Sequence, residues 1–329
     1  MGKSGAILVT GASGFVGSHL VERLLEAGFA VRALVRPSSD VAHLAELGVE
    51  RVVGTLDDLP ALVQAVSGAD AVLHLAAVTG ARSQAEYDRV NRDGTRLLVQ
   101  AMLTASPCPR RLVLLSSLAA VGPSADGRPV TAGDTPRPLT AYGRSKLAGE
   151  AETLALQGRA EVVVLRAPAV YGPRDRELLR FFRLARLGVL AVPGGPERYV
   201  QLIHVADLAD ALVRAVTAPG AAGIHHVADP QPYAWTQIVR WVGEAVGRRG
   251  IMIPVPGWMV RTAAVASEAA ARLRGGATVF NREKVTELLA PAWLADTTSA
   301  ERVLGFRTRI SLREGLADTA RWYRAHGWI

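Results

Sequence analysis

The sequence predicts an α/β fold with a doubly wound parallel sheet, followed by a smaller, mostly helical C-terminal domain. Two features of the first half predict the sheet: short apolar runs alternate with longer amphipathic stretches, and a glycine-rich turn follows the first run. A third feature predicts the second domain, because prolines and Pro-Gly steps end this alternation after residue 170.

Six near-continuous apolar runs are predicted as strands that are buried on both faces, as in parallel sheets. Helices are predicted between them, including Val16–Ala27, whose apolar side chains recur on one face, and Thr95–Ala105. Gly28 ends the first of these helices as a C-terminal glycine commonly does. The predicted strands are Ala6–Thr10, Ala30–Val35, Arg51–Val53, Ala71–Ala76, Arg111–Leu115 and Glu161–Leu165.

The C-terminal half is expected to contain three further helices, at Trp235–Val246, Trp258–Leu273 and Ser311–His326. We assign residues 1–172 and about 199–227 to the sheet domain, and residues 173–198 and 228–329 to the second domain. We expect the second domain to cover the carboxyl edge of the sheet, where open α/β sheets bind their ligands.

The turn after the first predicted strand reads Thr10-Gly-Ala-Ser-Gly-Phe-Val-Gly17 and leads into a helix. Glycines at such a turn allow a tight bend and a close approach of backbone to a pyrophosphate, and the helix N-terminus attracts the anion. The segment therefore predicts a site for a dinucleotide cofactor.

The end of the second predicted strand indicates which dinucleotide is bound. It reads Val35-Arg-Pro-Ser-Ser39, with no acidic residue before Asp40. An acid at this place bonds the ribose of NAD, whereas an arginine accommodates the 2′-phosphate of NADP. Arg36, assisted by Ser38 or Arg32, therefore predicts NADP, with NAD as the alternative.

Tyr142 and Lys146 are four residues apart, so on a helix they project from the same face. A free phenol titrates near pH ~10, too high for efficient proton exchange at neutral pH. A nearby ammonium favours the phenolate and lowers the tyrosine pKa toward the range in which general acid–base catalysis is efficient. Ser117 lies at the carboxyl end of the fifth predicted strand, two residues after Leu115 and at the ligand-binding edge of the sheet.

Together these segments resemble the extended short-chain dehydrogenase/reductase family. The resemblance covers nearly the whole chain and implies an NAD(P)-dependent enzyme with a Rossmann fold. It rests on Gly11, Gly14 and Gly17, on Ser116-Ser117, on Tyr142 and Lys146, on His74-Leu-Ala-Ala77, on Asn91, on Leu165-Arg-Ala-Pro-Ala-Val-Tyr-Gly-Pro173, on His204-Val-Ala-Asp207 and on Leu304-Gly-Phe306.

The resemblance also implies roles for particular residues. Tyr142 exchanges the proton with the substrate, Lys146 lowers the tyrosine pKa and bonds the nicotinamide ribose, and Ser117, with Ser116 as the alternative, donates to the substrate oxygen. At the adenine, Thr55 stands where the family usually has an acid. The implied cofactor contacts are Gly11, Ser13, Gly14, Phe15, Val16, Gly17, Arg36, Ser39, Thr55, Leu56, Leu75, Ala76, Ala77, Asn91, Tyr142, Lys146, Pro168 and Val170.

Three functions are open at this point. The first is an NADP-linked reductase or dehydrogenase acting on a ketone or secondary alcohol, similar to the hydroxysteroid dehydrogenase and dihydroflavonol reductase branches. The second is a nucleotide-sugar epimerase or dehydratase with tightly bound NAD. It is disfavoured because Val200-Gln201 and Val285-Thr286 stand where such members carry diphosphate-binding arginines, although Arg174, Arg176 or Arg282 could substitute. The third is a non-catalytic NADP sensor.

Composition limits the partners. The net charge of +8 comes mainly from dispersed arginines, and aromatic residues make up only 5% of the chain, so nucleic acid is not an expected partner. Cys108 is the only cysteine, and His225-His226 lack further ligands at metal spacing, so no metal site is expected. Neither a signal peptide nor a transmembrane segment is evident, which predicts a cytoplasmic enzyme for a small-molecule substrate. Dimers are common in the family, so a homodimer is one expected assembly.

Overall fold

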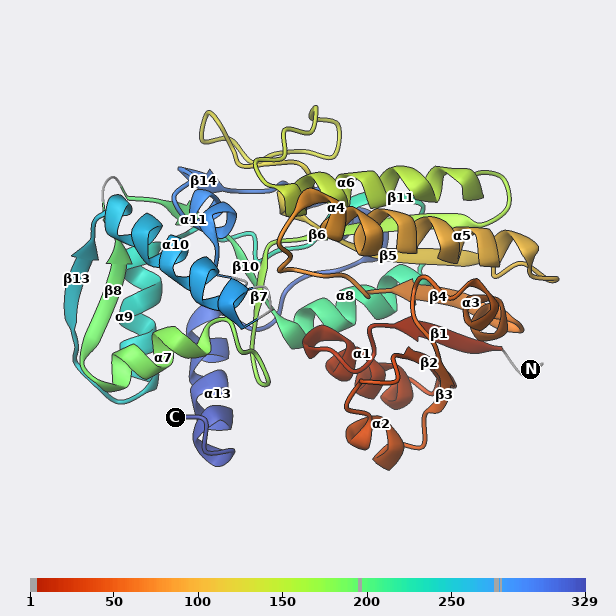
Figure 1. Cartoon of the computed structure of the whole chain (residues 1–329), viewed down its shortest axis with the longest axis horizontal. Coiled ribbons are helices and arrows are strands. Elements are labelled where there is room, and N and C mark those ends of the chain that lie inside the picture. The colour runs from red at the N-terminus through yellow and green to blue at the C-terminus, as the bar shows by residue number, and fades with distance from the viewer. Residues whose placement is uncertain (1–4, 195–196, 275–277, 279) are drawn as a thin grey trace.

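A seven-stranded parallel sheet forms the centre of the computed structural model, which describes residues 5–194, 197–274, 278 and 280–329. The strand order is β11-β6-β5-β4-β1-β2-β3, so the chain reverses its direction of travel between β1 and β4 (Figure 1). This is the predicted doubly wound α/β fold. The strands are β1 (Ala6–Thr10), β2 (Val31–Val35), β3 (Glu50–Val53), β4 (Ala69–His74), β5 (Arg111–Ser117), β6 (Glu161–Ala167) and β11 (Gly223–His226).

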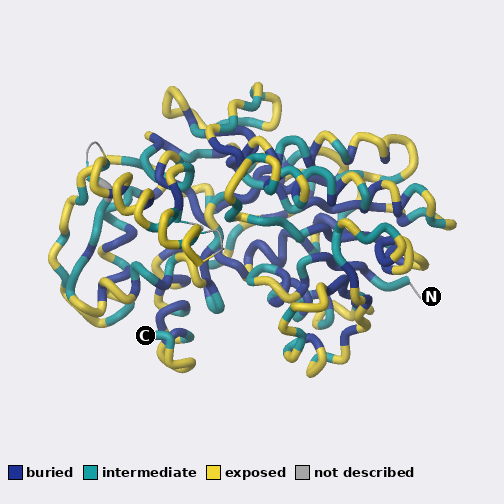
Figure 2. The backbone as a smooth tube through the Cα atoms, viewed as in Figure 1, coloured by how far each residue is buried: buried dark blue, intermediate teal, exposed yellow. Residues whose placement is uncertain are grey.

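Helices cover both faces of the sheet, which explains the continuous apolar runs. Ile7 and Val9 of β1 face one core, which α1 and α8 complete, whereas Leu8 faces the other core, formed with α3 and α5. Figure 2 shows the buried strands inside more exposed helices. The helices of this region are α1 (Phe15–Glu26), α2 (Ala42–Glu46), α3 (Leu59–Val66), α4 (Gln84–Asp88), α5 (Gly94–Thr104), α6 (Ala141–Glu152) and α8 (Val205–Thr217), with a π-helical turn at Arg89–Asp93.

The six predicted strands all form, and most of their boundaries lie within two residues of the predicted ones. β11 and α8 were not predicted as separate elements. β11 has only four residues, two of which are histidines, so its apolar signal is weak. β11 is stabilised by its pairing with β6. Helix α8 packs on α1 and does have apolar residues at helical spacing, including Val205, Leu208 and Leu212, so its omission was a missed local signal.

A separate apolar core lies in the C-terminal part of the chain, where the three predicted helices form (Figure 1). It joins Phe182, Leu190, Val239 and Tyr323 from α7, β8, α9 and α13. The helices here are α7 (Leu179–Arg186), α9 (Trp235–Ala245), α10 (Gly257–Leu273), α11 (Arg282–Leu288), α12 (Thr298–Leu304) and α13 (Leu312–Ala325). The short strands are β7 (Ala169–Tyr171), β8 (Val189–Pro193), β9 (Tyr199–Val200), β10 (Leu202–His204), β12 (Tyr233–Ala234), β13 (Ile251–Val255) and β14 (Ala292–Trp293).

We propose the same division into a sheet domain and a second domain that the sequence suggests. It is supported by the separate C-terminal core and by the pairing of β11 with β6. Among the helices that the structure describes, none has both the length and the apolar character needed to cross a membrane.

Candidate active site

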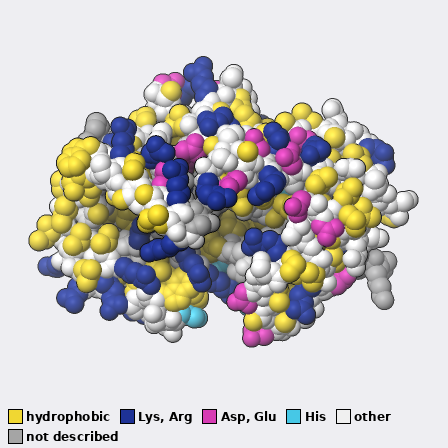
Figure 3. Space-filling view, in the orientation of Figure 1, with side chains coloured by type: hydrophobic (Ala, Val, Ile, Leu, Met, Phe, Trp, Pro, Cys, Tyr) yellow, Lys and Arg dark blue, Asp and Glu magenta, His cyan; other side chains and the backbone are white. Residues whose placement is uncertain are grey.

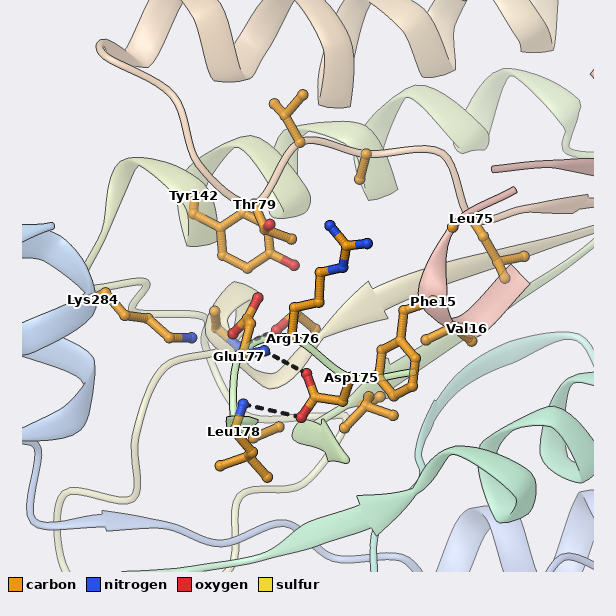
Figure 4. Close-up of a pocket in the computed structure, with 18 of the residues that line it drawn as sticks. Phe15, Val16, Leu75, Thr79, Tyr142, Asp175, Arg176, Glu177, Leu178 and Lys284 are labelled. Atoms are coloured by element: carbon orange, nitrogen blue, oxygen red, sulfur yellow. Dashed lines mark hydrogen bonds between the residues drawn. The ribbon is translucent and has the colours of Figure 1, made fainter. Parts of the chain in front are cut away.

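A cavity of about 1920 Å³ lies between the carboxyl edge of the sheet and the C-terminal elements. Pockets for a single small ligand usually measure about 300–1,000 Å³, so this one has room for two. Figure 4 shows Phe15 and Leu75 on one side, Tyr142 and Lys284 on the other, and Arg176 between them.

The glycine turn forms one wall of the cavity. Gly11 has a φ of +76°, and a Cβ there would lie 2.8 Å from the Ala76 nitrogen. A Cβ on Gly17 would lie 2.0 Å from the Gly11 oxygen, so only glycine lets α1 begin this close to the turn. Gly14 caps α1, whose first turn has no acidic residue. This cradle fits the pyrophosphate of a dinucleotide.

Arg36 and Ser39 line the cavity beyond β2. The Arg36 side chain is exposed, and it forms no ion pair with any residue that the structure describes. Arg32 is different, because its guanidinium bonds Glu50 at 2.7 Å and also donates to two backbone carbonyls. The suggestion that Arg32 assists Arg36 is therefore wrong. Thr55 also lines the cavity, and its hydroxyl donates to Asp57.

Ser117, Tyr142 and Lys146 all line the cavity. The Ser117 hydroxyl lies close enough to the Tyr142 phenol to lower its pKa, and it also accepts from the Ala119 nitrogen at 3.1 Å. Lys146 Nζ lies 2.7 Å from the Leu115 oxygen on β5, to which it donates. Ser116, the alternative donor, directs its hydroxyl to the Glu150 carboxylate at 2.5 Å, which leaves Ser117 as the serine that faces Tyr142.

The surroundings perturb the pKa values of both titratable groups. Burial raises the pKa of Tyr142, the Glu287 carboxylate raises it further, and the Ser117 hydrogen bond opposes the rise. Burial lowers the pKa of Lys146 to about 8, against the effect of Glu150. The expectation that the ammonium brings the tyrosine pKa down is not met, because burial and Glu287 raise this pKa and Lys146 is not among the groups that shift it.

Of the predicted cofactor contacts, all but Asn91 line the cavity. The buried Asn91 amide is engaged elsewhere: it accepts from the Val78 nitrogen at 2.9 Å and donates to the Val78 oxygen and the Ser145 hydroxyl. Asn91 thus ties the segment after β4 to α6, the helix that carries Tyr142. A direct contact of Asn91 with the cofactor has no support in this geometry.

His74 and His204, which the sequence motifs include, both have structural partners. His74 lies between the hydroxyls of Thr10 and Thr95, at 2.7 and 3.0 Å, and burial lowers its pKa to about 3. The His204 ring caps α8, whereas Asp207 accepts from two backbone nitrogens near Ile310, so these two residues do not pair with each other. No cluster of three or more metal-ligating side chains occurs among the described residues.

Helix α11 contributes polar groups that the sequence analysis missed. Glu287 accepts from the Thr140 hydroxyl at 2.9 Å, and Thr140 in turn caps α6. Glu283 accepts from the Ala141 nitrogen at 2.8 Å. Lys284 lies 3.3 Å from Glu287, at the cavity wall near Tyr142. The four-residue spacing of the two glutamates predicts a common helix face, but nothing local indicates that this face meets α6.

The loop before α7 was also missed. The buried Asp175 carboxylate accepts from the backbone nitrogens of Glu177 and Leu178 (Figure 4). Burial raises the pKa of Asp175 to about 6, which these two backbone hydrogen bonds oppose. Arg176 and Glu177 line the cavity beside it.

A Rossmann sheet with a glycine cradle at the start of α1 is typical of enzymes that bind a nicotinamide dinucleotide. The model of the NAD dependent epimerase/dehydratase family matches residues 7–228, and the chain belongs to this family. The family membership confirms the resemblance to extended short-chain dehydrogenases/reductases, and the protein is an NAD(P)-dependent enzyme of the reductase and epimerase superfamily.

Three similar proteins illustrate the range of this superfamily. The chain is 35% identical to a ceramide reductase of Caulobacter vibrioides over 99% of this chain and 96% of that protein. It is 30% identical to sterol demethylase protein B of Methylococcus capsulatus, over 98% and 99% of the two chains. Among solved structures, MoeE5 in complex with UDP-glucuronic acid and NAD is 30% identical, with a TM-score of 0.77 and coverage of 98% and 100%.

Proposed function

We propose that the protein uses NADPH to reduce a ketone on a largely apolar substrate, and oxidises the corresponding secondary alcohol in the reverse direction. The observation that carries this proposal is the position of Ser117, Tyr142 and Lys146 beside an apolar wall of the same cavity. When bound, the nicotinamide would supply the hydride. The pyrophosphate of the cofactor would rest against the glycine cradle, and the nicotinamide ring would lie beside Pro168 and Val170.

In this proposal the protein groups handle the proton and the developing charge. The Ser117 hydroxyl donates to the ketone oxygen, and Tyr142 delivers the proton to it. Because its pKa is raised, Tyr142 keeps its proton at neutral pH and can act as the donor. The Lys146 ammonium stabilises the phenolate that remains and bonds the nicotinamide ribose.

The apolar wall supports a lipid-like substrate. Phe181, Met259, Val260, Ala263 and Leu288 line the part of the cavity that the C-terminal elements form. Such a surface fits an extended hydrocarbon or a fused-ring system better than a sugar. The names of two relatives, ceramide reductase and sterol demethylase protein B, agree with a lipid substrate.

The polar groups near Tyr142 support a substrate with a polar head close to the ketone. Lys284, Glu177 and Glu287 lie at this end of the cavity. Burial opposes the Lys284 charge, but Glu287 and Glu177 more than offset this effect and raise the lysine pKa. A charged ammonium here would bond a hydroxyl or amide oxygen of the substrate.

The choice of NADP rests on Arg36. It is an exposed guanidinium at the cavity edge, without an ion-pair partner among the described residues, and Ser39 lies beside it. A 2′-phosphate would give this charge a partner.

The nucleotide-sugar alternative has less support. Gln201 uses both ends of its amide on backbone groups, at 2.7 Å to the Ala295 nitrogen and 3.1 Å to the Pro230 oxygen. Val285 lies in a small apolar core. Of the possible substitutes, Arg174 pairs with Glu22, leaving Arg176 as the arginine best placed for a diphosphate.

A substrate panel tests the proposal. The purified protein is incubated with NADPH or NADH and long-chain keto-lipids, ketosteroids, short ketones and UDP-sugars, while the absorbance of the reduced nicotinamide is followed. We expect NADPH oxidation with the keto-lipids or ketosteroids. Turnover of UDP-sugars alone, with NAD that stays bound through purification, would overturn the proposal in favour of the epimerase function.

A further inference from the structure

Helix α10 presents three different faces. Val260 and Ala264 pack in a small core against Val285. Met259 and Ala263 line the catalytic cavity. The third face turns outward, where Trp258, Val265 and Leu273 are 67%, 49% and 90% exposed. Their spacings of seven and eight residues place them in one stripe along the helix.

The outward face of α10 is exposed along most of its length, which Figure 2 shows in yellow. Exposed apolar side chains also precede the helix, because Ile251 and Ile253 of β13 are both exposed. Hydrophobic side chains gather at this end of the molecule in Figure 3. A contiguous apolar surface of this kind marks an interaction site rather than ordinary surface.

The same segment is strongly basic. Residues 248–274 contain five arginines and a single glutamate. Arg272 lies 4.0 Å from that glutamate, Glu268, whereas Arg261 and Arg274 form no ion pair within the described parts of the chain. Arg261 and Arg272 lie along one edge of the apolar stripe on the helical wheel, three residues from Trp258 and seven from Val265, respectively. Figure 3 shows basic side chains among the hydrophobic ones here.

We propose that α10 and β13 form a docking surface for a bilayer that contains anionic lipids. A helix with an exposed stripe of tryptophan, valine and leucine, and with arginines along one edge of it, has the composition of helices that lie in the membrane interface. The arginines complement anionic headgroups. Pairing with a second copy of the chain is less favourable, because a symmetric interface would bring these unpaired arginines together.

Docking would connect the bilayer to the cavity. Met259 is itself 44% exposed and also lines the cavity, so it lies where the docking surface meets the interior. An apolar molecule could pass from the acyl region along α10 into the cavity without crossing bulk water. The inference goes beyond the proposed reductase activity, because membrane binding is measurable without turnover.

Vesicle sedimentation tests the proposal. The full-length protein is mixed with vesicles of phosphatidylcholine alone or with added phosphatidylglycerol, and the bound fraction is measured at low and high salt. We expect binding to the anionic vesicles, weakened by salt. The double variant Val265→Glu/Leu273→Glu should bind at least about tenfold more weakly, and so should Arg261→Gln/Arg272→Gln.

Matched controls keep the test specific. Leu154 is exposed at 68% on the sheet domain, so Leu154→Glu should bind vesicles as the unmodified protein does. NADPH binding and turnover of a water-soluble ketone report whether Val265→Glu/Leu273→Glu is folded. Equal vesicle binding by that variant, or no binding by the unmodified protein, would overturn the proposal. A dimer in sedimentation velocity that Val265→Glu/Leu273→Glu abolishes would assign the surface to a second copy instead.

Discussion

The side chains of the proposed catalytic centre differ in what sets their protonation. Tyr142 keeps its proton because burial and the Glu287 carboxylate both disfavour the phenolate. Lys146, with a pKa near 8, is mostly charged at neutral pH and loses its charge as the pH rises above that value. Together these directions suit the transfer of a proton from Tyr142 to a ketone near neutral pH.

Replacing Tyr142 with Phe removes the proposed proton donor and little else. We expect kcat to fall by at least about 10²–10⁴-fold, the usual contribution of general acid catalysis. The Kd for NADPH, measured by fluorescence, should stay nearly unchanged. Tyr87 provides a matched control, because its ring lies 6.1 Å from that of Tyr142. Full activity in Tyr142→Phe, or an equal loss in Tyr87→Phe, would contradict the assigned role.

Arg36 is expected to determine the choice of cofactor. The Arg36→Ala variant should bind NADPH about 10- to 100-fold more weakly, since a charge-assisted hydrogen bond contributes about 1.5–3 kcal/mol. Binding of NADH should hardly change. Arg51→Ala, at an exposed arginine on β3 that is not part of the cavity wall, is the control. Equal losses for both cofactors in Arg36→Ala would argue against a 2′-phosphate site.

Helix α6 is held at two places by elements that are distant in the sequence. At its N-terminus, Glu283 and Glu287 of α11 bond Ala141 and Thr140. Toward its C-terminus, the buried Glu150 accepts two hydrogen bonds from Arg166 of β6, at 3.0 and 2.7 Å. The orientation of Tyr142 therefore depends on both the sheet and the second domain.

The substitution Glu287→Gln tests the effect of the Glu287 charge on Tyr142 separately from the hydrogen bond that holds Thr140. Glutamine can still accept from Thr140, but it removes the negative charge that raises the pKa of Tyr142. In the kcat/KM profile for ketone reduction, loss of the Lys146 charge sets a first alkaline limb near pH 8, and loss of the Tyr142 proton sets a second limb at higher pH. We expect this second limb to move to lower pH. Glu283→Gln is the control, and it should leave the limb in place. An unchanged profile in Glu287→Gln would show that this charge does not act on Tyr142.

Glu150→Gln should destabilise the fold strongly. The substitution leaves the Arg166 charge buried without its counterion, and such a loss costs about 3–5 kcal/mol of unfolding free energy. Chemical denaturation measures the change. Glu244 pairs with Arg313 and both side chains are exposed, so Glu244→Gln should cost much less. Similar midpoints for the two variants would contradict a structural role of the buried pair.

The whole molecule is expected to lose stability in mild acid. Burial lowers the pKa of His204 and His226 to about 4, from 6.5. The unfolded chain therefore binds more protons than the folded protein between these values, and the unfolding free energy falls as the pH drops from 6.5 to 4. Thermal unfolding across this range should show a smaller slope in His226→Gln. The exposed His326 is the control, and an equal change of slope in His326→Gln would refute the argument.

The sequence by itself determined the α/β class, the glycine cradle, and the positions of Ser117, Tyr142 and Lys146 along the chain. These features are local, because strand periodicity, glycine spacing and an i, i+4 pair are set by neighbouring residues. The sequence suggested that Arg32 assists Arg36, although Arg32 instead bonds Glu50, Ala65 and Ser67. These partners come from separate segments, so no local pattern indicates them.

Only the tertiary structure decided what surrounds the centre. Thr140 and Glu287 are 147 residues apart, and their contact depends on how α11 packs against α6. The same packing brings Lys284 to the cavity and leaves one face of α10 exposed. Contacts between distant segments arise from the fit of whole elements and leave no local pattern, so the sequence could name the proposed acid–base groups but not the walls around them.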